Sequence, residues 1–132
     1  MIKRIEHIGI AVKDVDNVLK LYSSMFGLRI GEITILKEHG LKIGFIKVGD
    51  TKLEFLESLR ENTPISKFID RRGEGIHHIC FQVDNIEETL KKLVADGIAL
   101  IDKKPRPGAQ GKKIAFIHPK STRDILMELC EV

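Results

Sequence analysis

The chain has 132 residues, of which 42% are hydrophobic and 31% are charged, and its formal net charge is +3. This length suits one globular domain with a sizeable core and is too short for two independent domains. The charge is spread through mixed Lys/Glu segments, which disfavours nucleic acid as a partner. Because no segment has the apolar length of a signal peptide or a membrane span, we expect a cytoplasmic protein without membrane partners.

The first half of the chain predicts a βαβββ module, which we place at residues 1–58. Asp14 is suited to cap its helix, and Gly27 to end that helix in the left-handed conformation. A connector at 59–74 follows, with a short helix over 65–72. The expected elements of the module are, in order, a strand over 5–12, a helix over 14–25, and strands over 28–36, 42–48 and 52–56.

The second half predicts the same order of elements, and we place this second module at residues 75–132. Asn85 followed by Glu88 is typical of a capped helix start, and Gly97 closes that helix. The fold expected is therefore α+β, with two tandem βαβββ modules forming an open, curved mixed sheet around a metal-binding cleft. The elements are a strand over 76–83, a helix over 85–96, a short strand over 99–101, and strands over 113–118 and 125–131.

The two modules also repeat at the level of single residues. Segment 6–12 (EHIGIAV) matches segment 77–83 (HHICFQV), which pairs His7 with His78. Segment 53–55 (LEF) matches segment 127–129 (MEL), which pairs Glu54 with Glu128. Because a duplicated unit folds into two copies of one shape, we expect a pseudo-two-fold axis to bring these four residues to a shared cleft.

Strand alternation assigns the four residues to one kind of face, since side chains two positions apart point the same way. The face opposite to them is apolar in each strand and is suited to packing against a helix. Glu128 is the most informative, because a carboxylate among apolar neighbours is costly to bury without a cation or a proton. The alternative is a pair of buried His–Glu hydrogen bonds without an ion.

Two imidazoles and two carboxylates predict an open, catalytic site for one divalent metal ion per chain, with Co, Mn, Ni, Fe and Zn all possible. The absence of cysteine from these positions disfavours a closed structural zinc centre. The two cysteines, Cys80 and Cys130, lack metal-type spacing and are expected to be free thiols.

With these residues in view, the chain resembles the vicinal oxygen chelate (glyoxalase-like) superfamily over essentially its whole length. Within it, the likeness is strongest to the methylmalonyl-CoA epimerase family. The segments that carry the likeness are EHIGIAV (6–12), EHG (38–40), PI (64–65), GIHHIC (75–80), VDNI (83–86), FIHPK (116–120) and EL (128–129).

This resemblance implies an isomerase that interconverts the 2R and 2S forms of methylmalonyl-CoA, through α-proton abstraction and a metal-stabilised enolate. It implies metal ligation by His7, Glu54, His78 and Glu128, with Glu128 also acting as a catalytic base. Some family members have a second glutamate on the third strand, where this chain has Ile43. A homodimer is implied as well.

The CoA thioester carries phosphates, and we expect cations of the 103–113 loop near the mouth of the cleft to bind the substrate. The candidate substrate-binding residues are Lys112, His118 and Lys120. The alternative functions are a glyoxalase I-type lactoylglutathione lyase, which His118 and the residues after it disfavour, and a non-enzymatic small-molecule binding module of the same fold.

Overall fold

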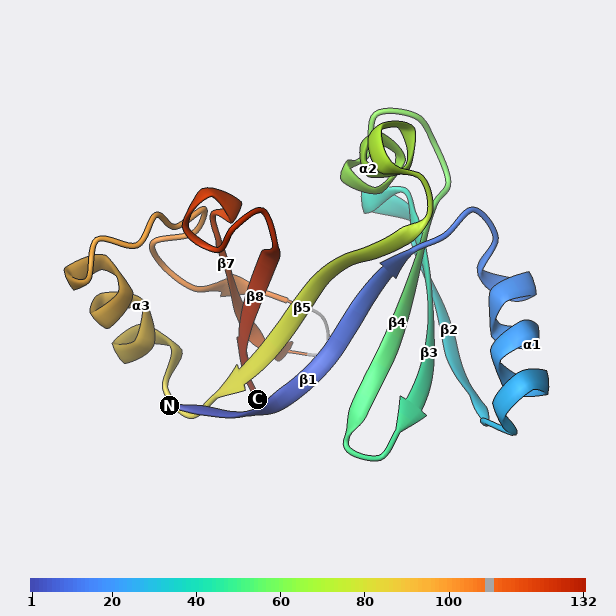
Figure 1. The fold of residues 1–132 in the computed structure, drawn as a ribbon, viewed down its shortest axis with the longest axis horizontal. Coiled ribbons are helices and arrows are strands. Elements are labelled where there is room, and N and C mark those ends of the chain that lie inside the picture. The colour runs from blue at the N-terminus through green and yellow to red at the C-terminus, as the bar shows by residue number, and fades with distance from the viewer. Residues whose placement is uncertain (109–110) are drawn as a thin grey trace. The chain divides into compact units, whose positions relative to one another are not determined.

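The computed structural model describes residues 1–108 and 111–132, and its elements follow the order expected from the sequence (Figure 1). The described part of the chain contains three α-helices and eight strands of a mixed sheet. The elements are β1 (Ile2–Ala11), α1 (Val15–Phe26), β2 (Ile30–Leu36), the 3₁₀ turn η1 (Lys37–His39), β3 (Leu41–Val48), β4 (Thr51–Ser58), α2 (Pro64–Arg72), β5 (Gly75–Val83), α3 (Ile86–Ala95), β6 (Arg106–Pro107), β7 (Lys113–Ile117), the 3₁₀ turn η3 (Pro119–Ser121) and β8 (Leu126–Glu131).

The chain forms two compact units. The N-terminal unit is His7–His77, and the C-terminal unit combines Met1–Glu6 with His78–Val132, so both chain ends belong to it (Figure 1). In the N-terminal unit the strands follow the order β2-β3-β4-β1, and in the C-terminal unit β6-β7-β8-β5. In each unit the first strand pairs in parallel with the last, and the remaining neighbours are antiparallel. The predicted α+β fold with two βαβββ modules is therefore confirmed.

The duplication extends to the way each helix begins. The side chains of Asp14 and Asn85 cap α1 and α3 by accepting a backbone N–H three residues on. In addition, Glu57 Oε1 accepts the N–H of the first residue of α1, and Glu131 Oε1 accepts that of α3, both at 2.9 Å. A carboxylate at a helix N-terminus satisfies an unpaired N–H and complements the helix dipole. The last strand of each module thus fixes the helix of the same module.

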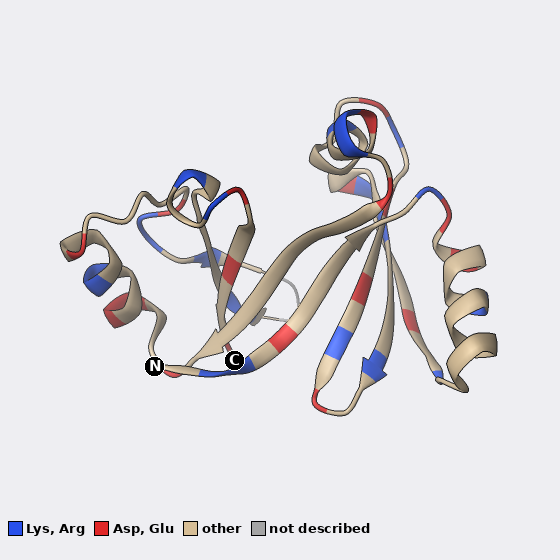
Figure 2. Ribbon diagram, in the orientation of Figure 1, with Lys and Arg blue, Asp and Glu red and all other residues tan. Residues whose placement is uncertain are grey.

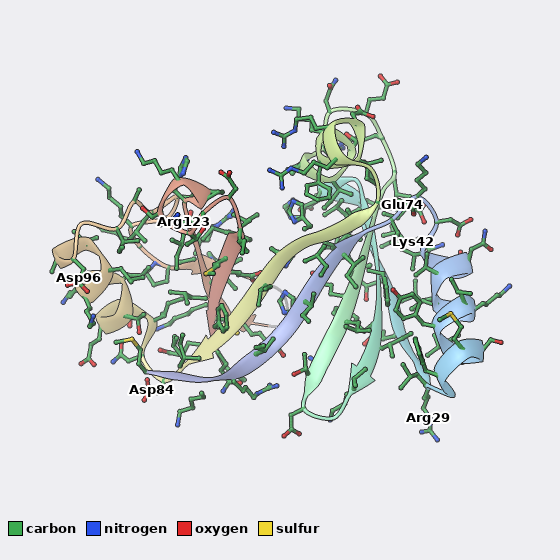
Figure 3. All side chains as sticks on the ribbon, in the orientation of Figure 1. Arg29, Lys42, Glu74, Asp84, Asp96 and Arg123 are labelled. Atoms are coloured by element: carbon green, nitrogen blue, oxygen red, sulfur yellow. The ribbon has the colours of Figure 1, made fainter. Side chains whose placement is uncertain are left out.

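Charged residues are spread over both units, and one pair of ionic contacts is itself repeated (Figure 2). Lys42, labelled in Figure 3, places its Nζ 2.6 Å from Asp16 Oδ2 at the start of α1. The equivalent Lys113 lies 3.1 Å from Glu87 Oε1 at the start of α3. Because the lysines are on β3 and β7, these contacts attach the middle of each sheet to its helix.

Each helix covers the apolar face of its own sheet. In the N-terminal unit, Val15 and Leu19 of α1 are fully buried against Phe55. In the C-terminal unit, Ile86 and Leu90 of α3 pack against the apolar face of β5, β7 and β8. These are the faces that strand alternation assigns to the helices.

A second apolar cluster in the N-terminal unit lies on the opposite face of the sheet. It consists of Ala11, Ile43 and Leu56 from three strands, with Ile65 and Phe68 from α2. The connector between the modules is therefore also a packing element, since its helix covers the far end of the face that carries His7 and Glu54.

The strand predicted over residues 99–101 is wrong. Only an isolated bridge joins Leu100 to Ile117 there, and the two-residue strand β6 lies further along the chain. The physical reason is that Asp102 Oδ2 accepts the Phe116 N–H at 2.9 Å. In a continuous antiparallel pair of strands, a backbone carbonyl would accept this N–H, so the side chain takes the place of that carbonyl. Among the described residues, no helix is long and apolar enough to span a membrane.

Candidate metal-binding and catalytic site

In the N-terminal unit, β1 and β4 bring one histidine and one glutamate together. The parallel register aligns His7 with Lys52 and Gly9 with Glu54, so the two ligand-type side chains are two positions apart on one face. His7 is 6% exposed, and its Nε2 lies 3.7 Å from Glu54 Oε2.

In the C-terminal unit, β5 and β8 repeat this arrangement. His78 aligns with Leu126 and Cys80 with Glu128, which is the equivalent register. Both members of the pair are buried, with His78 5% and Glu128 7% exposed, and His78 Nε2 lies 3.3 Å from Glu128 Oε1. Acidic residues on β4 and β8 are visible in Figure 2.

The donor set of each pair fits a divalent ion. Two ligand atoms that each lie about 2.1 Å from a common ion, at tetrahedral or octahedral angles, are about 3.0–3.4 Å apart. The pair in the C-terminal unit already has this spacing, and the pair in the N-terminal unit is a few tenths of an ångström wider. The described residues therefore include a candidate His/Glu metal site, whose donor types do not select one metal.

Position 43 carries no acid in this chain and is closed to water. Ile43 is 9% exposed, aligns with Leu56 on β4, and packs in the cluster that Phe68 of α2 completes. The next residue on the same face of β3 is Phe45, which aligns with Glu54. No proton carrier is present on this part of β3.

The C-terminal unit contains a buried carboxylate that the sequence analysis did not select. Glu6 is 2% exposed, and its Oε2 lies 3.3 Å from Lys112 Nζ and 3.6 Å from Arg4 Nη2. Glu6, like Glu128, is a carboxylate inside an apolar strand segment, and its burial therefore needs a cation. The sequence therefore indicated that Glu6 needs a cation, but Lys112, which pairs with Glu6, is distant along the chain.

The two cysteines lie on the same face as the His78–Glu128 pair and are free and buried. A hydrogen bond with Cys130, together with burial, raises the pKa of the Cys80 thiol. The charge of Glu128 raises the same pKa further. At neutral pH, Cys80 is therefore a neutral, unreactive neighbour of the candidate site.

The predicted substrate-binding residues differ in their surroundings. Lys112 is largely buried in its ion pair with Glu6. His118 and Lys120 are exposed, and His118 Nδ1 accepts the Lys120 N–H at 3.1 Å, which leaves the proton of a neutral imidazole on Nε2. In the loop, Arg106 Nε lies 3.3 Å from Asp102, so this cation is engaged by a carboxylate.

Comparison with protein families supports the assignment of the fold. A model described as the Glyoxalase/Bleomycin resistance protein/Dioxygenase superfamily matches residues 6–116. The chain belongs to this superfamily. The match spans both units and three of the four candidate ligands, with Glu128 beyond its end.

Within the superfamily, the chain is similar to proteins named as epimerases. It is 37% identical to the mitochondrial methylmalonyl-CoA epimerase of Dictyostelium discoideum, over 98% of this chain and 79% of that protein. It is 35% identical to the ethylmalonyl-CoA/methylmalonyl-CoA epimerase of Cereibacter sphaeroides, and the match covers the whole of both proteins. A Streptomyces coelicolor methylmalonyl-CoA epimerase variant, solved in complex with 2-nitronate-propionyl-CoA, superimposes with a TM-score of 0.91 at 30% identity, covering 99% of this chain and 95% of that one.

Superfamily members named as lyases match less fully. The lactoylglutathione lyase of Schizosaccharomyces pombe is 30% identical over 86% of this chain, but the chain spans only 43% of that protein. The epimerases are therefore matched over more of their own length than the lyase is.

Proposed function

We propose that this chain is a metal-dependent epimerase that interconverts the 2R and 2S forms of methylmalonyl-CoA. The observation that carries the proposal is the two repeat-equivalent His–Glu contacts, one in each unit of a chain that is similar over its length to methylmalonyl-CoA epimerases. This assigns the protein to the isomerases. Its substrate is an acyl-CoA thioester.

In this proposal, His7, Glu54, His78 and Glu128 together hold one divalent ion, which is Co, Mn, Ni, Fe or Zn. The support is the chemical and geometric equivalence of the two pairs, since a single ion with four such ligands uses each module in the same way. When bound, the ion supplies Lewis-acid stabilisation of the negative charge that forms on the thioester oxygen.

Glu128 is the residue to which we assign proton transfer at the α-carbon. The proton to be removed lies between a thioester and a carboxylate, and a carboxylate base in water is too weak to remove it at a useful rate. Glu128 is 7% exposed, so it can act where water does not compete for the proton. The carboxylate accepts the proton on one of its oxygens, and the α-carbon is reprotonated on its opposite face.

Reprotonation on the opposite face requires a second proton carrier. Position 43 cannot supply this carrier, because Ile43 has no titratable group and is packed in an apolar cluster. We propose that Glu54, His118 or a bound water serves instead. His118 and Lys120, both exposed at η3, are proposed to contact the CoA portion of the substrate.

The proposal is tested by isotope exchange. Purified protein incubated with methylmalonyl-CoA in deuterium oxide is expected to exchange the α-proton, as followed by mass spectrometry. The same protein with the glutathione hemithioacetal of methylglyoxal is the control, and it should form no lactoylglutathione. Turnover of the hemithioacetal alone would support the lyase instead, and binding without turnover of either compound would support a non-enzymatic binding module.

Two further properties complete the proposal. We propose a cytoplasmic protein that is a homodimer, as the family likeness implies. Light scattering coupled to gel filtration would then give twice the chain mass of 14.9 kDa. A mass equal to that of one chain would refute the dimer.

A further inference from the structure

In the C-terminal unit, an aromatic ring connects the His78–Glu128 pair to an arginine. Phe116 on β7 aligns with Glu128 on β8, so the two side chains point to the same face of the sheet. The ring centroid of Phe116 lies 6.1 Å from that of His78, and Arg106 Cζ lies 5.2 Å from the same Phe116 centroid. A guanidinium at this distance is attracted to the face of a ring. These contacts place Arg106 beside the ring that borders the candidate site.

Asp102 fixes the position of this guanidinium. Its Oδ2 accepts the Arg106 Nε–H at 3.3 Å and the Phe116 N–H at 2.9 Å, so one carboxylate oxygen holds both partners of the cation–π contact. The side chain of Asp102 is 18% exposed, whereas that of Arg106 is 52% exposed. The side-chain bond that interrupts the predicted 99–101 strand therefore has a second consequence, because it orients Arg106 from the inner side.

The outer edge of the guanidinium faces away from these contacts. An arginine has five N–H donors, and within the described part of the chain only the Nε–H of Arg106 donates a hydrogen bond to a carboxylate. The Nη1 and Nη2 groups form a planar fork that matches two oxygens of a phosphate, which it can bind through two parallel hydrogen bonds. Arg106 is therefore a positioned, half-exposed cation with donors suited to an anionic ligand.

The distance from Glu128 decides which anion this fork can bind. β6 is the outermost strand of the C-terminal unit and is separated from β8 by β7, so Arg106 and Glu128 lie two strand spacings apart, or about 10 Å between backbones. The acyl carboxylate is attached to the carbon that loses its proton, so it must lie close to the base. The phosphates of CoA are separated from this carbon by the pantetheine arm and can reach the edge of the sheet.

We propose that Arg106, positioned by Asp102 against Phe116, binds a phosphate of the CoA portion of the substrate. This rests on the proposed function, because it names a further substrate-binding residue for that reaction. CoA carries both a diphosphate and a ribose phosphomonoester, and either group supplies the oxygens that the fork requires.

The experiment compares three thioesters of the same acyl group. Racemic methylmalonyl-CoA, its dephospho-CoA analogue and its pantetheine analogue are titrated calorimetrically into the Co²⁺-loaded protein, and a racemate undergoes no net reaction. In Arg106→Met the Kd for methylmalonyl-CoA is expected to rise about tenfold, through loss of charge-assisted hydrogen bonds. The Kd for the pantetheine thioester should change by less than about twofold. A tenfold loss that persists with dephospho-CoA assigns the contact to the diphosphate, and a loss confined to the full CoA thioester assigns it to the phosphomonoester.

Two variants control for nonspecific charge and for folding. Lys104→Met removes an exposed cation of the same loop and should leave all three Kd values within about twofold. Asp102→Asn keeps an oxygen that can accept the Phe116 N–H but weakens the hold on Arg106. The Kd for methylmalonyl-CoA should then rise about threefold, because binding must also order the arginine, while the Kd for the pantetheine thioester stays unchanged. A merely structural role of Asp102 would affect both ligands.

An equal loss of affinity for methylmalonyl-CoA and for the pantetheine thioester in Arg106→Met would overturn the proposal in favour of a contact with the acyl group. An unchanged Kd for methylmalonyl-CoA in this variant would overturn it as well. These outcomes are separate from failure of the proposed function, which would appear as absent α-proton exchange in the unmodified protein.

Discussion

The two His–Glu pairs are copies in register, but the side chains around them differ. The His7–Glu54 pair shares its face with the apolar cluster that α2 closes. The His78–Glu128 pair shares its face with two buried thiols, near the Glu6–Lys112 ion pair. The comparison indicates that the close His–Glu contact was kept in both units, whereas its surroundings differ, with apolar side chains in the N-terminal unit and with thiols and a buried ion pair in the C-terminal unit.

The largest effect on α-proton exchange is expected for substitution of Glu128, and substitution of an exposed glutamate is the control. Glu128→Ala should lower α-proton exchange by about a thousandfold, the range for loss of a positioned base, and should also reduce bound metal. Glu38 lies exposed in η1, so Glu38→Ala should change neither quantity. Exchange and metal content are measured on the same preparations, and exchange retained in Glu128→Ala would refute its assigned role.

The apolar surroundings of the N-terminal pair are tested by Phe68→Ala. Phe68 of α2 is 8% exposed and packs against Ile43 and Leu56 of the sheet, so its truncation should lower the free energy of unfolding by about 3 kcal/mol. The matched control is Leu21→Ala in α1, at a side chain that is 52% exposed, with a change of about 0.5 kcal/mol or less. Urea denaturation followed by circular dichroism measures both, and equal effects would show that α2 is a connector only.

A smaller effect is expected at the glutamate of the N-terminal pair. Glu54→Gln keeps the size and one ligand oxygen but removes the charge, so metal affinity should fall about tenfold while exchange remains measurable. Competition with a chelator gives the affinity. If Glu54→Gln abolished exchange as fully as Glu128→Ala, the functional difference between the two pairs would disappear.

The smallest effect concerns the turns that lead into the last strand of each unit. In the N-terminal unit, Gly49 has φ +60°, a conformation that glycine adopts without cost. In the C-terminal unit, Arg123 (Figure 3) and Asp124 adopt φ +59° and +69°. Asp124→Gly should therefore stabilise the protein by about 0.5 kcal/mol and Gly49→Ala should destabilise it by about 1 kcal/mol. Urea midpoints measure both, and a destabilised Asp124→Gly would show that the Asp124 side chain stabilises the turn.

Much of the fold was predictable because its signals are local. The period-2 alternation in β1 and β5, and the capping residues Asp14 and Asn85, are each contained in a few consecutive residues. The His–Glu pairs were predicted from the internal repeat, because equivalent positions in two copies of one module are expected to lie at equivalent places in the fold.

The remainder depended on contacts between distant residues. Alternation assigns Glu6 to the face of Ile8, but β1 belongs to both units, and Glu6 lies in the C-terminal unit with Lys112. The packing of α2 against Ile43 and the side-chain bond from Asp102 that breaks the 99–101 strand are likewise set by tertiary partners. A sequence pattern specifies that Glu6 needs a cation but not which one.

The most direct test of the account is metal binding by single-histidine variants. Equilibrium dialysis of the unmodified chain against Co²⁺ should give about one ion per chain, and His7→Ala and His78→Ala should each lower the affinity by at least about tenfold. This result is expected because, in the proposed function, one ion is held by both pairs. Two ions per chain, with each variant losing only one of them, would contradict a shared site, as would undiminished binding in either variant.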